Sequence, residues 1–440
     1  MARRLTALLS GLLLAGLALL PAAPAGAAAP AEELAELCAE LWGGTSPTDE
    51  PLAACQWDME QIGATTDGAH ALATGEGVRV GVLDSGVDPT HDDIAPNLDW
   101  AASCSFIDDD TPTAAAGEAG NGDCTNKSAV VDVNGHGTHV ASTIAAPVSG
   151  IGIAGVAPDA TLVAIKVCTE AGYCFADSVA AGLRYAGDLG LDVVNLSLFA
   201  DPYLYYCGNE AEQRAILREL QRATRYAQQR GVLVVASAGN EQADLAHPEL
   251  DTISPDWPPD TAVEREVGNN CRVAPAELTG VLTVSATGPE ELASYSSVGM
   301  GVVDVAAPGG DYFAATDTVQ DAILGALPNT PNDIFASLDP LEAFLPGLTV
   351  VDQGNNYGFL NGTSMAAPHA AGVAALIVEQ HPDWSWGAVA AAVRATATEM
   401  ACPADYVQEE ESQIARCYGG EGRTSFFGAG LVDAEAAARR

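Results

Sequence analysis

Positive charge is scarce in this sequence. Lysine and arginine together number 18 against 59 aspartates and glutamates, the formal net charge at pH 7 is −41, and Lys127 and Lys166 are the only lysines. Nucleic acids and anionic lipid surfaces both bind proteins through positive charge. The composition therefore excludes nucleic acid and membrane surfaces as main partners. It is typical of a soluble exported protein, and it also suits tolerance of salt or cationic substrates.

Long apolar runs are also absent after the N-terminus, where no segment reaches the roughly 18 residues of a membrane span. Residues 1–29 differ, because Arg3 and Arg4 precede "LTALLSGLLLAGLALL" and then Ala-x-Ala cleavage positions near Ala27 or Ala29. This is the pattern of a secretory signal peptide, and the paired arginines hint at twin-arginine export. A membrane anchor is the alternative, but the apolar run is short for a span. We expect a signal peptide at 1–29 and an extracellular mature protein.

No C-x-x-C pair occurs among the ten cysteines, which weighs against a zinc site. In an exported chain, an even number of cysteines favours disulfides. Sequence alone does not fix their connectivity. Proximity along the chain favours the pairs 38–55, 104–124, 168–174, 207–271 and 402–417.

From Trp57 onwards, strand patterns alternate with helix patterns. The expected strands include "GVRVGVLD", "ATLVAIKV", "LDVVNLSL", "VLVVAS" and "GVLTVSAT", and helical segments separate them. Strands that are apolar on both faces indicate a parallel sheet covered on both sides. The predicted fold is a doubly wound, mostly parallel α/β sheet with long loop insertions. Residues 100–132, 241–275 and 311–357 show no clear element, and loops of such length tend to be functional.

Four polar residues stand at strand ends or helix starts. Asp84 closes an apolar strand, His136 lies between glycines in "NGHGTH", Asn240 ends "VVASAGN", and Ser364 begins an apolar helix. Taken singly, each has an ordinary explanation as a turn residue, a satisfied polar group or a helix cap. Together they supply the nucleophile, base, orienting carboxylate and oxyanion donor that serine-dependent amide hydrolysis requires.

The motifs in this order resemble the subtilisin family of serine peptidases, the subtilases. The matching segments are "VGVLDSGVD", "NGHGTHVAS", "VVASAGN" and "NGTSMAAPHAAG", and the resemblance runs from about Trp57 to Ala434. The order Asp, His, Ser is that of subtilisin. More loosely, the short N-terminal region and "YYCGNE" resemble actinobacterial subtilases similar to lantibiotic leader peptidases. The implied domains are a short extension or pro-segment at 30–56 and a catalytic domain at 57–440.

The resemblance implies a role for each of the four residues. Ser364 would attack the scissile carbonyl, His136 would carry the proton, and Asp84 would orient the imidazole. The side chain of Asn240 and the backbone N–H of Ser364 would form the oxyanion hole. The chemistry would need no cofactor.

Substrate contacts and a metal site follow from the same resemblance. The substrate channel would be lined by Ser197, Leu198, Phe199, Ala238 and Gly239, with Phe199 standing where the family usually has glycine. A structural calcium ion is a further expectation.

Asp93 matches a common calcium-ligand position, whereas Ser149 stands where an asparagine ligand is frequent. His139 lies three residues after His136, but without an H-E-x-x-H pattern we expect His139, like His91 and His369, to be structural. The apolar segment 311–357 must pack on something, and we expect it to flank the substrate cleft.

The sequence thus predicts a secreted, disulfide-stabilised, monomeric serine endopeptidase acting on polypeptides. One alternative is a processing peptidase dedicated to a single precursor or leader. The other is a non-catalytic binding protein with the same fold, against which the four intact motifs weigh.

Overall fold

The computed structural model describes residues 29–330, 334, 347–403 and 416–440. Its centre is a seven-stranded sheet in the order β12-β11-β7-β5-β2-β4-β3, in which all neighbouring strands are parallel. In chain order these strands are β2 (Arg79–Asp84), β3 (Cys104–Ser105), β4 (Thr161–Lys166), β5 (Val193–Leu196), β7 (Leu233–Ser237), β11 (Leu282–Thr287) and β12 (Val305–Pro308). The order reverses direction between β2 and β5. In sheets of this kind, ligands bind beyond the carboxyl ends of the strands at that point.

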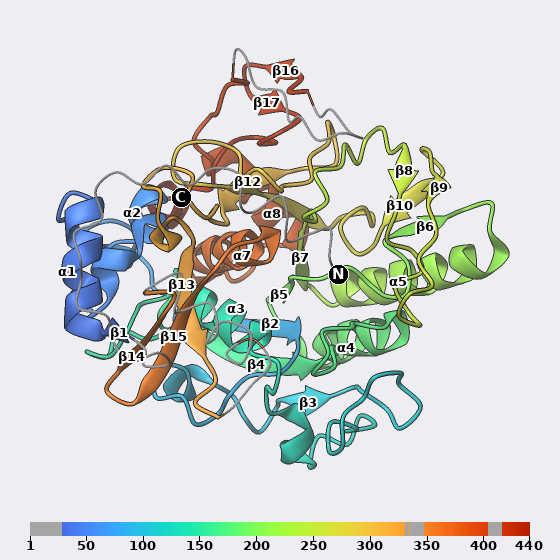
Figure 1. Ribbon diagram of the computed structural model, residues 1–440, viewed down its shortest axis with the longest axis horizontal. Helices are drawn as coiled ribbons and strands as arrows, with labels where there is room; N and C mark the ends of the chain where they lie inside the picture. Colours follow the sequence, from blue (N-terminus) through green and yellow to red (C-terminus); the bar gives the residue numbers. More distant parts are fainter. Residues whose placement is uncertain (1–28, 331–333, 335–346, 404–415) are drawn as a thin grey trace.

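Helices cover both faces of the sheet, which confirms the predicted doubly wound fold (Figure 1). One hydrophobic core contains α3 (His136–Ala145) and α7 (Thr363–Gln380), and the other contains α4 (Ala176–Leu189) and α5 (Ala211–Gln229). Strand β2 supplies both cores, since Val80 and Val82 belong to the first and Leu83 to the second. This alternation is the two-residue period of a strand buried on both sides.

Helix α7 is the central helix of the molecule. It is apolar on all sides and almost entirely buried, as expected for a helix that crosses the interior of a large domain. Its N-terminus, which carries Ser364, faces the carboxyl edge of the sheet. The small residues of "MAAPHAAG" allow neighbouring elements to approach closely; a Cβ at Gly372 would lie 2.6 Å from Cβ of Val156.

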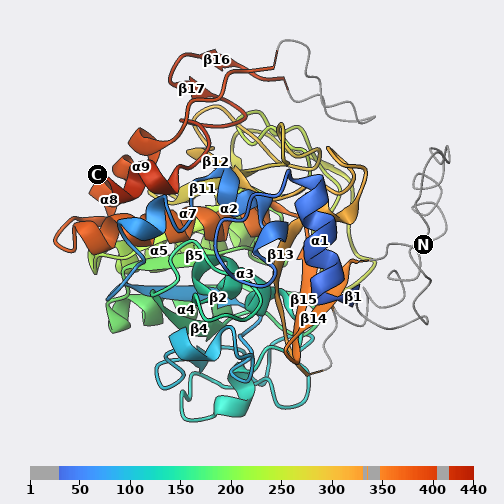
Figure 2. The same cartoon turned by 90° about the vertical axis from the view of Figure 1, so that its left-hand side faces the viewer.

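A second sheet lies against α3, on the left of Figure 1. It has the order β1-β14-β15-β13, with strands β1 (Ala29–Pro30), β13 (Ile323–Leu327), β14 (Thr349–Asp352) and β15 (Asn355–Leu360). Figure 2 shows α1 (Ala31–Leu41) beside this sheet at the outer surface. Strands β13 and β14 fall in segment 311–357, where the sequence showed no clear element, and β15 begins there. Its described apolar residues pack as expected, because Ile323, Leu324 and Leu327 are buried. Residues 331–333 and 335–346 of the segment lie outside the described residues.

The remaining elements are short. They are α2 (Trp57–Gln61), α8 (Trp386–Thr396), α9 (Ala434–Ala438) and the antiparallel pairs β6 (Tyr205–Cys207) with β10 (Cys271–Val273), β8 (Leu250–Asp251) with β9 (Arg265–Glu266), and β16 (Gly419–Gly420) with β17 (Arg423–Thr424). Among the described helices, none has the length and apolar character needed to cross a membrane. The predicted signal peptide lies almost wholly outside the described residues.

All ten cysteines form disulfides, and the five pairs are those expected from proximity. Cys38–Cys55 joins α1 to the turn before α2, so the N-terminal extension is covalently closed on itself. Cys207–Cys271 joins β6 to β10 beside the substrate side of the sheet. The zinc alternative is excluded for these cysteines, because no thiolate remains to bind a metal.

Candidate active site

A cleft of about 350 Å³ opens at the carboxyl edge of the central sheet, where the strand order reverses. It brings together Asp84, His136, Asn240 and Ser364, which lie up to 280 positions apart in the chain. Asp84 ends β2, and Asn240 follows β7. His136 begins α3, and Ser364 is the second residue of α7. The predicted site residues therefore meet in one place, as the topology of a doubly wound sheet requires.

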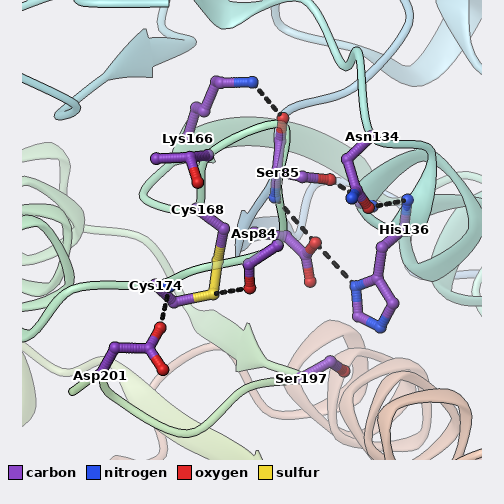
Figure 3. The surroundings of a disulfide bond; sticks show 12 residues. Asp84, Ser85, Asn134, His136, Lys166, Cys168, Cys174, Ser197 and Asp201 are labelled. Carbon is purple, nitrogen blue, oxygen red and sulfur yellow. Dashed lines mark hydrogen bonds and ion pairs between the residues drawn. A yellow bond between two sulfur atoms is a disulfide. The ribbon is translucent and has the colours of Figure 1, made fainter. Parts of the chain in front are cut away.

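The carboxylate of Asp84 and the imidazole of His136 are in direct contact in this cleft (Figure 3). His136 Nδ1 donates to Asp84 Oδ1 over 2.8 Å, and the backbone N–H of Ser85 donates to the same oxygen over 2.7 Å. Asp84 is 1% exposed. Nδ1 of the imidazole is thus held as a donor, so Nε2 remains as the position that accepts a proton.

The pKa of His136 lies above its ordinary value. Burial alone would lower the pKa, but the charge and hydrogen bond of Asp84, together with the charge of Asp132, raise it by more. The environment therefore favours the imidazolium form, which is the form that a base adopts after it has taken a proton.

A buried carboxylate, Asp132, fixes the distance between the two partners. It accepts hydrogen bonds from Ser85 Oγ at 2.9 Å, from the Gly135 backbone N–H at 2.8 Å and from Thr138 Oγ1 at 2.7 Å. Ser85 follows Asp84, and Gly135 precedes His136. Asp132 therefore joins the end of β2 to the start of α3.

Lys166 and Asn134 complete this support (Figure 3). Nζ of Lys166 donates to the Ser85 carbonyl over 2.7 Å and pairs with Glu118 Oε1 at 2.8 Å, with both side chains almost fully buried. Asn134 Oδ1 accepts from the His136 backbone N–H over 3.1 Å. The sequence analysis assigned no role to Asp132, Lys166 or Asn134; Asn134 directly precedes the glycine before His136, whereas Lys166 ends the distant strand β4.

Ser364 is the second residue of α7. Its Oγ lies 3.2 Å from the Ser197 carbonyl oxygen, to which it donates, while Ser197 Oγ donates to the Ser364 carbonyl over 2.6 Å. Within the described part of the chain, the Ser364 hydroxyl therefore donates its hydrogen bond to Ser197, the residue after β5, and not to His136. Rotation about the Cα–Cβ bond of Ser364 would redirect its hydroxyl. A hydrogen bond between a catalytic hydroxyl and its base often forms only once substrate is bound.

Asn240 is oriented by the residue before Ser364. Its Oδ1 accepts from the Thr363 backbone N–H over 2.9 Å and from Thr363 Oγ1 over 2.8 Å. A backbone N–H needs an acceptor, and the only acceptor of an asparagine amide is its oxygen, so this contact fixes which end of the amide is which. Nδ2 is left as a donor at the cleft. Thr363 Oγ1 also accepts from the Gly239 N–H over 3.1 Å, so Thr363 joins the end of β7 to the start of α7.

The predicted substrate-contact residues divide into two groups. Ser197, Leu198, Phe199 and Gly239 line the cleft. Ala238 is fully buried and is not among the residues that line it. Gly239 has φ of +109°, a backbone conformation that favours glycine.

The three histidines expected to be structural are buried in hydrogen bonds to carbonyl or carboxylate oxygens. His139 Nε2 lies 3.1 Å from the Ile323 carbonyl, and burial, aided by the charge of His136, lowers the pKa of His139 to about 3. His91 bonds to the Asn356 carbonyl, and His369 bonds to Asp58 and to the Met365 carbonyl. None of the three lines the cleft.

The surroundings of Asp93 do not fit calcium. Its Oδ2 accepts from the Ile153 N–H and the Tyr357 hydroxyl, each at 3.1 Å, and burial first of all raises the pKa of Asp93 to about 8. Ser149 Oγ lies 3.5 Å from Oδ1. Calcium requires six to eight oxygen ligands, whereas N–H and O–H donors occupy this carboxyl group. Within the described residues, no group of three or more metal-ligating side chains is assembled.

Comparisons with known proteins agree with this geometry. A sequence model of the subtilase family matches residues 75–430. Subtilisin Savinase from Lederbergia lenta is 32% identical over 384 residues, which cover 87% of this chain and 98% of that protein. M-protease from Shouchella clausii (strain KSM-K16) is 32% identical over 384 residues, or 87% of this chain and 70% of that protein.

Solved structures share the fold. A protease from Pseudoalteromonas arctica has a TM-score of 0.61 and 26% identity, covering 90% of this chain and 99% of that one. A lanthipeptide protease has a TM-score of 0.60 and 24% identity, covering 87% of this chain and 93% of that one.

The raised pKa of His136 gives a test that needs no substrate. We expect the imidazole of His136, followed by NMR, to titrate above about 6.5, the value of free histidine. Replacing Asp84 by asparagine removes the charge that favours the imidazolium and should lower the pKa of His136. Asp317→Asn, an exposed change elsewhere, should leave it in place.

The same shift affects stability. Because the pKa of His136 is raised in the folded state, its pairing with Asp84 contributes fully to stability at pH values below the pKa of the unfolded chain. The contribution is lost as the pH rises through the pKa of the folded state.

An unchanged His136 titration in Asp84→Asn would contradict the assignment of Asp84 as its main partner.

Proposed function

Since this chain belongs to the subtilase family and is a subtilisin-like serine endopeptidase, we propose that Asp84, His136 and Ser364 are its catalytic triad. The observation that carries the proposal is the buried Asp84–His136 hydrogen bond in the cleft that also holds Ser364. The three residues come from β2, α3 and α7. Each is held by backbone contacts at the edge of one rigid sheet.

The proposed reaction begins when Ser364 Oγ, released from Ser197, attacks the scissile carbonyl of a polypeptide. His136 Nε2 takes the hydroxyl proton and later gives it to the leaving amine. Asp84 stabilises the imidazolium that forms between these steps. Water then attacks the acyl-enzyme with the same base, which releases the second product and restores the hydroxyl.

The negative charge of the tetrahedral intermediate needs donors. Asn240 Nδ2 and the backbone N–H of Ser364 are proposed for this role. Thr363 binds the carbonyl oxygen of the Asn240 side chain, which leaves Nδ2 as the donor for the negative charge. Ser364 lies at the N-terminus of an 18-residue helix, where free N–H groups and the helix dipole favour negative charge.

The proposal also covers the surroundings in which the enzyme works. Five disulfides support export to an oxidising compartment, with a signal peptide at 1–29 and action outside the cell. A net charge of −41 supports a protein without nucleic-acid partners, and we propose a monomer. We propose no calcium at Asp93, because its hydrogen-bond partners are donors.

A fluorophosphonate probe tests the triad directly. Intact mass after labelling should show one adduct per chain, because only a serine activated by a neighbouring base reacts with the probe. Ser364→Ala should abolish the adduct. Ser128→Ala, an exposed serine outside the cleft, should retain it. An adduct that persists in folded Ser364→Ala would place the nucleophile elsewhere.

Asn240 is tested by kinetics. Asn240→Ala should lower kcat by roughly 100–1000-fold, the loss known for the corresponding asparagine of subtilisin, with a smaller effect on KM. Labelling by the fluorophosphonate should persist but slow down. Turnover equal to that of the native enzyme would remove Asn240 from the oxyanion hole.

A narrow processing peptidase, dedicated to one precursor or leader, is the second candidate function. It is favoured by Ile334, which belongs to segment 311–357 and lines the cleft, where its N–H donates to the Asn134 carbonyl over 2.9 Å. Phe199 lines the same cleft in the position where the family usually has glycine. A lanthipeptide protease shares the fold.

Ile334→Ala distinguishes the two functions. Deleting 320–346 would also remove β13, which pairs with β15, the strand that precedes Ser364 in the chain. A loss of activity could then come from damage to the fold, so a point substitution is the clearer test. If the segment restricts substrate entry, casein digestion should be slow in the native enzyme and rise by about 10-fold in the variant. Val351→Ala, on the exposed side of β14, is the matched control. Fast casein digestion by both would favour a general endopeptidase.

A further inference from the structure

One end of the cleft contains an acidic pocket that the proposed mechanism does not use. Asp201 and Asp256 both line the cleft, although neither belongs to the triad or to the oxyanion hole. Asp201 follows β5 closely, and Asp256 lies in segment 241–275, one of the long segments without a clear sequence signal. Two loops that lie apart in the chain thus supply this end of the cleft.

The Asp201 carboxyl group is held in place from behind. The Cys174 backbone N–H donates to its Oδ2, and the Cys168–Cys174 disulfide closes the loop that carries this donor (Figure 3). The Asp201 N–H donates to the Cys174 carbonyl over 3.0 Å. Asp201 is 3% exposed, so the carboxyl group is a fixed part of the wall.

The second carboxyl group is incompletely bonded. Asp256 and Asp201 contact each other side chain to side chain, and burial followed by this contact raises the pKa of Asp201 well above its ordinary value. Oδ1 of Asp256 is fully buried and accepts no hydrogen bond from the described residues. A buried carboxyl oxygen without a donor is costly, so the pair of carboxyl groups would be stabilised by a positive charge placed beside it.

An aromatic wall stands next to the two carboxyl groups. Tyr173 stacks on Phe175 with ring centroids 5.9 Å apart, and both rings meet Trp257 edge-on at 5.5 and 6.5 Å. Tyr173 lines the cleft, and its hydroxyl lies 3.5 Å from the Asp256 carbonyl. Aromatic faces attract cations, and a guanidinium also stacks on them.

No lysine or arginine is among the described residues that line the cleft. The charged or acidic residues of the lining are Asp84, Asp201, Glu241, Asp256 and the imidazole of His136. The nearby Lys166 is committed to Glu118 and to the Ser85 carbonyl. The cleft therefore presents a field that favours a cationic side chain of the substrate.

We propose that Asp201, Asp256 and Tyr173 form a specificity subsite for a basic side chain of the polypeptide substrate, with arginine preferred to lysine. The guanidinium would donate to the paired carboxyl groups of Asp256 and Asp201 while its plane lies on Tyr173. The planar, forked geometry of arginine matches paired carboxyl oxygens better than a single ammonium does. The inference rests on the proposed peptidase function and adds its substrate class.

Fluorogenic peptides that scan arginine, lysine and citrulline through each position test the subsite. Citrulline keeps the shape of arginine without its charge. At one position we expect kcat/KM for arginine to exceed that for citrulline by about tenfold or more, the effect of a hydrogen bond to a charged group. Equal rates for arginine and citrulline at every position would overturn the proposal.

Two variants locate the effect. Asp256→Asn should reduce the arginine-to-citrulline ratio to near one, and the ratio is independent of how much active enzyme each preparation contains. Asp260→Asn is the matched control, because Asp260 lies in the same loop, is exposed and has φ of +64°, which asparagine accepts. A ratio unchanged in Asp256→Asn would also overturn the proposal.

Failure of the subsite differs from failure of the enzyme. If no peptide is cleaved and the fluorophosphonate does not label Ser364, the peptidase function itself is wrong. If labelling is normal and citrulline peptides are cleaved as fast as arginine peptides, only the subsite is wrong. Should Asp256→Asn fail to fold, the native enzyme's arginine-to-citrulline comparison still decides.

Discussion

The hydrogen bond between the buried Asp84 carboxylate and His136 is the interaction on which the active site depends. A carboxylate that is 1% exposed is tolerable only with donors, and here the imidazole and the Ser85 N–H supply them. The same bond fixes the tautomer of the imidazole and raises its pKa. The strand that ends at Asp84 and the helix that begins at His136 must therefore be held in one relative position.

Two small networks provide that precision. Asp132 binds Ser85 on one side and the first turn of α3 on the other, with Lys166 behind it. Thr363 plays the corresponding part for α7, since its hydroxyl and N–H join Gly239 and Asn240 to the residue before Ser364. The second sheet adds a further constraint, because His139 of α3 bonds to carbonyl oxygens of β13 and β15. The site is thus placed by rigid elements, and its loops shape only the cleft walls.

The central sheet, the meeting of Asp84, His136, Asn240 and Ser364 in one cleft, and the disulfide pairs could be predicted from the sequence, for physical reasons. Strands buried on both faces are continuous apolar runs, and chemistry at their carboxyl ends requires polar residues such as Asp84 and Asn240 at known places. Cysteines close in sequence, such as Cys168 and Cys174, have few alternatives. The antiparallel strands β13, β14 and β15 were missed because they are short and because glycines interrupt two of them, Gly325 in β13 and Gly358 in β15. Gly325 packs on the His139 ring.

Other features depend on contacts that only the fold creates. Asp132 and Lys166 read as ordinary charged residues until burial shows their role. Asp93 matches a calcium-ligand position in sequence, yet Ile153 and Tyr357 both donate to its Oδ2. Asp201 and Asp256 come from separate segments, so no spacing along the chain could have paired them.

The most direct test of the central claim is a crystal structure with a peptide boronic acid bound. The account predicts a bond from boron to Ser364 Oγ, with one boronate oxygen about 2.7–3.1 Å from Asn240 Nδ2 and the Ser364 N–H. His136 Nε2 should contact the adduct while Nδ1 keeps its hydrogen bond to Asp84. Boron bonded to another residue, or a boronate oxygen directed away from Asn240, would contradict the account.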